Sequence, residues 1–116
     1  MIAITAKAFV PARNFEVSRR FYEALGFTQE WANTELAYFT HGTACFFLRN
    51  GSPPGLAENF LMHLLVDDAD AWYEQARMAC ADFGLTPEAP ANRPWGTRDF
   101  LVPDPSGVHW RITQPL

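Results

Sequence analysis

Acidic, basic and imidazole side chains share one face of a predicted strand pair near the end of the sequence. Polar and apolar residues alternate along residues 108–113, which places His109 and Arg111 on the same side of an extended strand. Asp99 alternates with apolar residues in the preceding strand. A small soluble protein has little reason to collect these side chains on a sheet face unless a polar group binds there. Asp99 either anchors a cation of that ligand or pairs with Arg111 or Lys7.

His63 lies in another alternating stretch, at residues 59–66, and its position predicts the same inward-facing side as His109. Two histidines together with Asp99 could bind zinc or iron in principle. The alternative, which we favour, is that all three are polar cavity residues that bond one another or water.

Aromatic residues make up 15% of the chain, and several of them fall in predicted strands. Trp31 and Trp95 lie at strand ends beside polar residues, where a purely structural tryptophan is less expected. Phe39 and Phe47, together with Phe9, either form a ligand-stacking wall or pack in the core. Aromatic walls suit flat or cationic ligands, through stacking and cation–π contacts.

The elements that must position these residues occur in the same order twice. The first set comprises a strand at 2–10, a helix at 15–25 between Asn14 and Gly26, and strands at 27–31, 36–40 and 43–48. The second set, after a linker at 51–57, comprises a strand at 59–66, a helix from Asp68 to Phe83, a weak strand at 86–89 and a final hairpin.

This order predicts an α+β fold of two βαβββ modules, at about 1–50 and 58–116, within one domain of residues 1–116. The modules are expected to form a cupped mixed sheet around a shared cavity, because each helix covers only one face of its sheet. Such modules could exchange between two chains, so we expect a homodimer, domain-swapped or not, with composite pockets.

Composition excludes several classes of function. The net charge is −4 and no basic block occurs, which argues against nucleic acid and anionic membranes as partners. Cys45 and Cys80 form no metal or redox motif, and both are expected to be reduced thiols of a cytoplasmic protein. No signal peptide or membrane-spanning stretch is evident.

Two motifs and the paired βαβββ order resemble one protein family. The first motif is Phe21-Tyr22-Glu23-Ala24-Leu25-Gly26-Phe27, and the second is the turn Asp104-Pro105-Ser106-Gly107. Together they resemble the vicinal oxygen chelate superfamily, which includes glyoxalase I, extradiol dioxygenases and bleomycin resistance proteins. The segments Pro94-Trp95-Gly96 and Arg98-Asp99-Phe100 are most similar to the bleomycin resistance proteins. That resemblance implies a dimer that sequesters a cationic glycopeptide antibiotic in interface clefts without catalysis.

The enzymatic branches of that family hold a metal through four positions, and these fall here near Lys7, Cys45 or Phe47, Leu61 and Arg111. Cationic side chains repel a divalent cation, so the resemblance implies that the family's metal chemistry is absent. A further departure is His63, which stands where the bleomycin resistance proteins line their cleft with an aromatic residue.

We therefore expect a homodimeric, metal-free protein that has no cofactor and sequesters an aromatic, optionally cationic, antibiotic-like ligand. One alternative is a metal-dependent glyoxalase-like or dioxygenase-like enzyme that uses His63 and His109. Another is a dimeric scaffold that binds no ligand. No catalytic or metal-binding residue is assigned. The predicted ligand contacts are Trp31, Phe39, Phe47, His63, Trp95, Asp99, His109 and Arg111.

Overall fold

The computed structural model describes all residues from Met1 to Leu116 and contains two four-stranded sheets, each with one α-helix. The first module consists of β1 (Phe9–Ala12), α1 (Phe15–Leu25), β2 (Thr28–Ala32), β3 (Leu36–His41) and β4 (Ala44–Asn50). Its strands, which we call sheet A, lie in the order β1-β4-β3-β2, with β1 parallel to β4.

The second module follows a short 3-10 helix (η1, Ala57–Asn59) and repeats the pattern. It consists of β5 (Leu61–Leu65), α2 (Ala69–Ala81), β6 (Ala91–Arg93), β7 (Thr97–Pro103) and β8 (His109–Pro115). Its strands, sheet B, lie in the order β5-β8-β7-β6, with β5 parallel to β8. The two βαβββ modules of the predicted α+β fold are thus confirmed.

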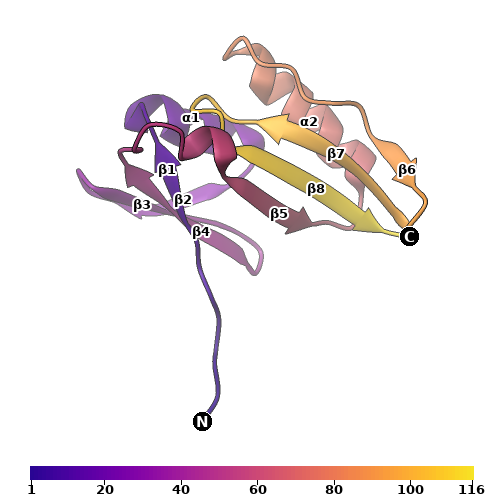
Figure 1. Ribbon diagram of the computed structural model, residues 1–116, viewed down its shortest axis with the longest axis horizontal. Coiled ribbons are helices and arrows are strands. Elements are labelled where there is room, and N and C mark those ends of the chain that lie inside the picture. Colours follow the sequence, from indigo (N-terminus) through magenta and orange to yellow (C-terminus); the bar gives the residue numbers. More distant parts are fainter.

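Both helices begin where the sequence indicates, and α1 also ends there. α2 ends at Ala81 and not at the predicted Phe83, because the amides of Phe83 and Gly84 bond to carbonyls only three residues back. The side chain of Asn14 accepts a hydrogen bond from the Val17 amide (3.2 Å), and Asp68 does the same for Ala71 (3.1 Å). Gly26 ends α1 with a φ of 116°, a conformation that other residues rarely adopt. The helices pack against each other on one side of the sheets (Figure 1). Neither helix is long and apolar enough to span a membrane.

The core lies between the helices and one face of each sheet. The strand residues that form it are Val10, Ala12, Ala37, Phe39, Phe46, Leu48, Leu64, Phe100, Val102, Trp110 and Ile112. The opposite face of each sheet has no element of this chain over it, and we call these surfaces the open face of sheet A and the open face of sheet B.

A buried hydrogen-bond network joins the two sequence motifs, which explains why they occur together. The Tyr22 hydroxyl, from α1, donates to the Asp104 carboxylate (2.6 Å) and accepts from the Trp110 indole N–H (2.9 Å). The second Asp104 oxygen accepts from the amides of Ser106 and Val108, at 2.8 and 2.9 Å. This network fixes the first module to the β7–β8 turn of the second.

The first strand is shorter than predicted. β1 and β4 are parallel and Phe9 pairs with Phe47, so Ala6 would lie opposite Ala44, the first residue of β4. Residues before about Ala6 therefore have no strand to pair with, and residues 1–7 leave the body as an extended arm (Figure 1). Pro11 is tolerated in β1 because this strand lies at an edge of sheet A.

The weak strand also lies later than the predicted residues 86–89. Pro87 and Pro90 lack the N–H groups that a ladder needs, and that segment makes a single backbone bond to β7, from Glu88 to Leu101 (2.9 Å). The regular pairing with β7 begins at Ala91.

Candidate functional site

Four aromatic rings form a continuous row across the open face of sheet A. The strand register places Phe9 beside Phe47, and Phe47 beside Tyr38. Their ring centroids lie 4.8 Å apart for Phe9 and Phe47, which are stacked, and 5.1 Å apart for Tyr38 and Phe47. Trp31 completes the row at 6.1 Å from Tyr38. These four residues are the aromatic row.

Trp31 reaches the open face because β2 contains a bulge. Gln29 pairs with Phe39 but Trp31 pairs with Tyr38, so the register shifts at Glu30. An extra residue of this kind turns the following side chains to the other face of the strand. The Trp31 side chain is consequently 45% exposed.

A cation lies over the aromatic row. The Lys7 ammonium is 4.9 Å from the centroid of the Tyr38 ring and 5.8 Å from that of Phe47. These distances are within the range of a cation–π interaction. Lys7 therefore does not pair with Asp99, which was one of the two predicted partners.

The open face of sheet B carries a buried carboxylate between two arginines. Asp99 is 1% exposed, and one of its oxygens accepts from Arg93 Nε and Arg111 Nη1, each at 2.8 Å. Its other oxygen accepts from the Thr97 hydroxyl (3.1 Å). Next to this cluster, His63 Nε2 and the Thr113 hydroxyl are 3.0 Å apart.

These partners set the charge state of Asp99. Burial alone would raise the pKa of its carboxyl group, but the hydrogen bonds from Arg93 and Thr97 and the charges of Arg93 and Arg111 outweigh it, so the pKa lies below its ordinary value. Asp99 is thus an ionised carboxylate whose oxygens are occupied by this chain's own donors.

The Asp99→Asn variant is expected to lose about 2–3 kcal/mol of unfolding free energy at neutral pH, because two arginines lose their counter-charge. The folded-state pKa is lowered, so the carboxylate's stabilising contribution is present above the unfolded pKa and is lost as pH falls through the folded value. The difference between wild type and variant, measured by urea unfolding, should therefore shrink below about pH 4. A difference that is constant from pH 7 to pH 2 would contradict the ion-pair cluster.

The predicted ligand contacts lie in four different places in the structure. Trp31 and Phe47 lie on the open face of sheet A, within the aromatic row. His63, Asp99, His109 and Arg111 lie on the open face of sheet B. Trp95 lies in the β6–β7 turn and is 71% exposed. Phe39 is fully buried.

The expectation for Phe39 is therefore corrected. Its ring stacks on Phe46 and contacts Tyr22 of α1, on the helix side of sheet A. Its neighbour Tyr38 takes the open-face position instead, and the sequence reasoning missed it. Arg93 was missed as well, since the segment that holds it was not predicted to be a strand.

The candidate metal ligands His63, His109 and Asp99 are not placed to bind one ion together. His63 pairs with Arg111 across β5 and β8, while His109 pairs with Leu61. Asp99, the third candidate ligand, is bound by two guanidinium groups. No group of three or more His, Cys, Asp or Glu side chains is placed to hold a metal ion.

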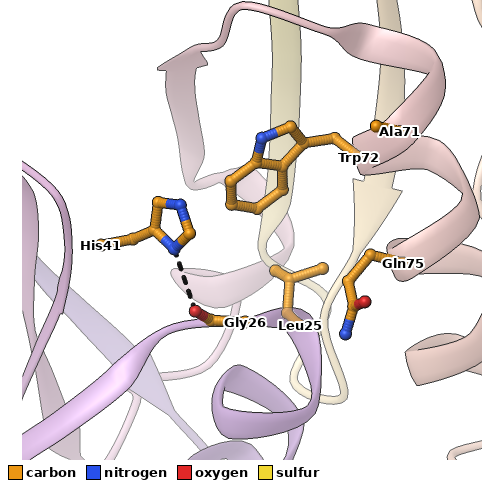
Figure 2. Close-up of a pocket in the computed structure, with 6 residues that line it drawn as sticks. All are labelled: Leu25, Gly26, His41, Ala71, Trp72 and Gln75. Carbon is orange, nitrogen blue, oxygen red and sulfur yellow. Dashed lines mark hydrogen bonds between the residues drawn. The ribbon is translucent and has the colours of Figure 1, made fainter.

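Two cavities lie near the seam between the modules. One of about 340 Å³ lies between the N-terminal arm, β4 and β5, and His63 and Cys45 are among its lining residues. The other, of about 290 Å³, lies on the helix side between α1 and α2 (Figure 2). In this second cavity His41 Nδ1 donates to the Gly26 carbonyl (3.0 Å) and Trp72 packs edge-on against the imidazole. None of the predicted site residues lines it.

Comparison with known proteins decides the family. The sequence model of the glyoxalase/bleomycin resistance protein/dioxygenase superfamily matches residues 4–112. The chain belongs to this superfamily. A comparison with curated proteins found no match.

Several solved structures of the superfamily are similar over nearly their whole length. A bleomycin-binding protein complexed with bleomycin is 25% identical with a TM-score of 0.80, over 98% of this chain and 100% of that chain. A bleomycin resistance determinant encoded on transposon Tn5 is 26% identical with a TM-score of 0.79, over 97% and 98%. TnmS3, an antibiotic-binding protein from Streptomyces sp. CB03234, is 25% identical with a TM-score of 0.76, over 100% of both chains.

Proposed function

We propose that this superfamily member is a homodimeric, metal-free binding protein of the bleomycin-resistance type. It captures an aromatic, antibiotic-like small molecule and makes or breaks no bond in it. The observation that carries this proposal is the aromatic row. Four neighbouring rings lie on a sheet face that no helix or strand of the chain covers, and such rings suit the stacking of a flat ligand.

The apolar groups that one chain leaves uncovered support the dimer. Leu61 and Leu65 on the open face of sheet B are 62% and 63% exposed, and the arm carries two exposed isoleucines, Ile2 and Ile4. Exposed apolar side chains of this kind favour an interface with a second copy. In a two-fold dimer each contact occurs twice, so the aromatic face of one copy can meet the charged face of the other and form two equal clefts.

The neighbours support the same class of ligand. The similar structures at 25–26% identity are described as binding bleomycin, conferring bleomycin resistance or binding an antibiotic. Sequestration in the cytoplasm agrees with the two cysteines, since Cys45 and Cys80 are both free thiols.

Titration of the tryptophan fluorescence with a panel of antibiotics tests the proposal. Trp31 lies in the aromatic row, so a compound that stacks there should quench its emission. We expect saturable quenching at micromolar concentration by at least one aromatic compound, and loss of that signal in the Trp31→Phe variant. If no compound of the panel changes the emission, the binding function is wrong.

Elemental analysis of protein purified without a chelator tests the metal-free part. The pairing of Asp99 with Arg93 and Arg111 leads us to expect no stoichiometric metal. One equivalent of zinc, nickel or iron that is lost in a His63→Ala/His109→Ala variant would instead favour the metalloenzyme alternative.

A further inference from the structure

The charged groups on the two open faces are the strongest unexplained feature of these surfaces. The sequence led us to expect a ligand that is aromatic and optionally cationic, with Asp99 as the anchor for its positive charge. In the structure the carboxylate of Asp99 has three donors from this chain and is 1% exposed. It offers no free oxygen to a ligand cation.

Arg111 is a donor that remains partly free on the open face of sheet B. The Arg111 side chain is 36% exposed, and only its Nη1 atom makes a hydrogen bond, to Asp99. Its Nε and Nη2 atoms are left for another acceptor. The second arginine of the cluster, Arg93, is held at the sheet edge, because its Nη2 atom also donates to Glu88 (2.9 Å).

The open face of sheet A presents the same sign of charge next to the rings. The Lys7 ammonium lies over Tyr38 and Phe47 and has no carboxylate within salt-bridge distance. The acidic residue of β2 is Glu30, and one of its carboxylate oxygens accepts from the Thr40 hydroxyl (2.6 Å).

We infer that the ligand of this site is an aromatic anion, a ring system that carries a carboxylate or an equivalent acidic group. In the proposed dimer its rings stack on the aromatic row of one copy, beside Lys7, and its acidic group accepts from Arg111 of the other copy. Guanidinium groups bind planar carboxylates through two parallel hydrogen bonds, and such charge-assisted bonds are about twice as strong as neutral ones. This inference rests on the proposed function and adds the chemical class of the ligand.

Three matched anthraquinones test the inference: the 2-carboxylate, the 2-carboxamide and the 2-aminomethyl cation. They share one ring system and differ in the charge and hydrogen-bonding groups of a single substituent, so quenching of tryptophan emission compares what the site prefers at that substituent. We expect the carboxylate to bind at least about tenfold more tightly than the other two. Its affinity should also fall with added salt.

Two arginine variants test whether Arg111 is responsible for the preference for the carboxylate. Arg111→Gln should reduce the affinity for the carboxylate about tenfold and change that for the carboxamide less than twofold. Arg98→Gln is the matched control, since Arg98 belongs to the same sheet but pairs with Asp70 of α2 on the helix side. It removes the same charge from the protein and should leave all three affinities unchanged.

The outcomes separate this inference from the proposed function. Equal affinities for the three compounds, or preference for the cation, would overturn the anion inference and leave the binding function in place. A loss of carboxylate binding in Arg98→Gln that equals the loss in Arg111→Gln would overturn it too, because net charge alone would then be responsible. Failure of all three anthraquinones together with the whole antibiotic panel would overturn both.

Discussion

The Asp104→Ala variant is expected to lose about 3–5 kcal/mol of unfolding free energy, a large part of the stability of a domain of this size. Asp104 is 1% exposed and accepts from the Tyr22 hydroxyl and from two backbone amides of its own turn. Alanine leaves all three donors buried without a partner. Urea unfolding followed by circular dichroism measures the loss.

A double-mutant cycle with Tyr22→Phe isolates the contact between the modules. Asp104→Asn keeps an oxygen for the two amides, so it should cost less than Asp104→Ala. If the hydroxyl–carboxylate bond couples the modules, the two substitutions together should cost less than the sum of the single effects, by about 1–3 kcal/mol. Additive effects would mean that the 2.6 Å contact contributes nothing to the stability.

The pH dependence of Asp104 has the opposite sign to that of Asp99. Burial raises the pKa of Asp104, and the hydrogen bonds that it accepts reduce that rise without cancelling it. A raised folded-state pKa gives a contribution that is present below the unfolded pKa and is lost as pH rises through the folded value. The stability of wild type relative to Asp104→Asn should therefore decrease as pH rises from about 4.

Glutamate in place of Leu65 is expected to separate the two copies of the proposed dimer and to abolish ligand binding. Leu65 is 63% exposed on the open face of sheet B, so the substitution should leave the fold of one chain intact. A buried, unpaired carboxylate in the dimer interface would cost several kcal/mol, which corresponds to a rise of about a hundredfold or more in the dimer dissociation constant. Sedimentation velocity measures the dissociation.

Met78→Glu is the matched control for this variant. Met78 is an equally exposed apolar residue, at 61%, but it lies on α2, on the helix side of the molecule. Glutamate there should change neither the dimer nor the binding. If Leu65→Glu remains a dimer with wild-type affinity, the open face of sheet B is not part of the interface.

The sequence alone predicts which side of a strand a residue faces, and where a helix begins, wherever polar and apolar residues alternate regularly or a capping residue is present. The regular alternation of residues 108–113 places Trp110 in the core and Arg111 on the open face, as the structure confirms. The caps Asn14 and Asp68 likewise mark the starts of both helices, because each side chain satisfies an amide that the helix leaves free.

The sequence does not predict which side of a strand is buried when both sides carry residues of the same type. In β3 an aromatic residue falls on each side, and only packing against Tyr22 of α1 decides that Phe39 is buried and Tyr38 open. The bulge at Glu30, which turns Trp31 to the open face, leaves no mark in the hydrophobic pattern. Such choices depend on tertiary contacts that a single strand does not encode.

The pairing of Asp99 was one of two alternatives left open by the sequence. Arg111 could be foreseen as a partner because the two residues share a face of the hairpin. Arg93 could not, since two prolines obscure the short strand β6 that brings its guanidinium to the carboxylate. The second arginine is what removes Asp99 as an anchor for a ligand cation.

Subunit complementation tests the central claim, that each ligand cleft takes its aromatic face from one copy and its charged face from the other. One variant, Phe9→Ala/Trp31→Ala, removes two exposed rings of the aromatic row, and the other is Arg111→Gln. Each alone should bind anthraquinone-2-carboxylate poorly. In a random mixture about half of the dimers are mixed and one of their two clefts is intact, so equilibrium dialysis should recover about a quarter of the wild-type sites. No recovery, from variants that are both folded and dimeric, would contradict the composite cleft.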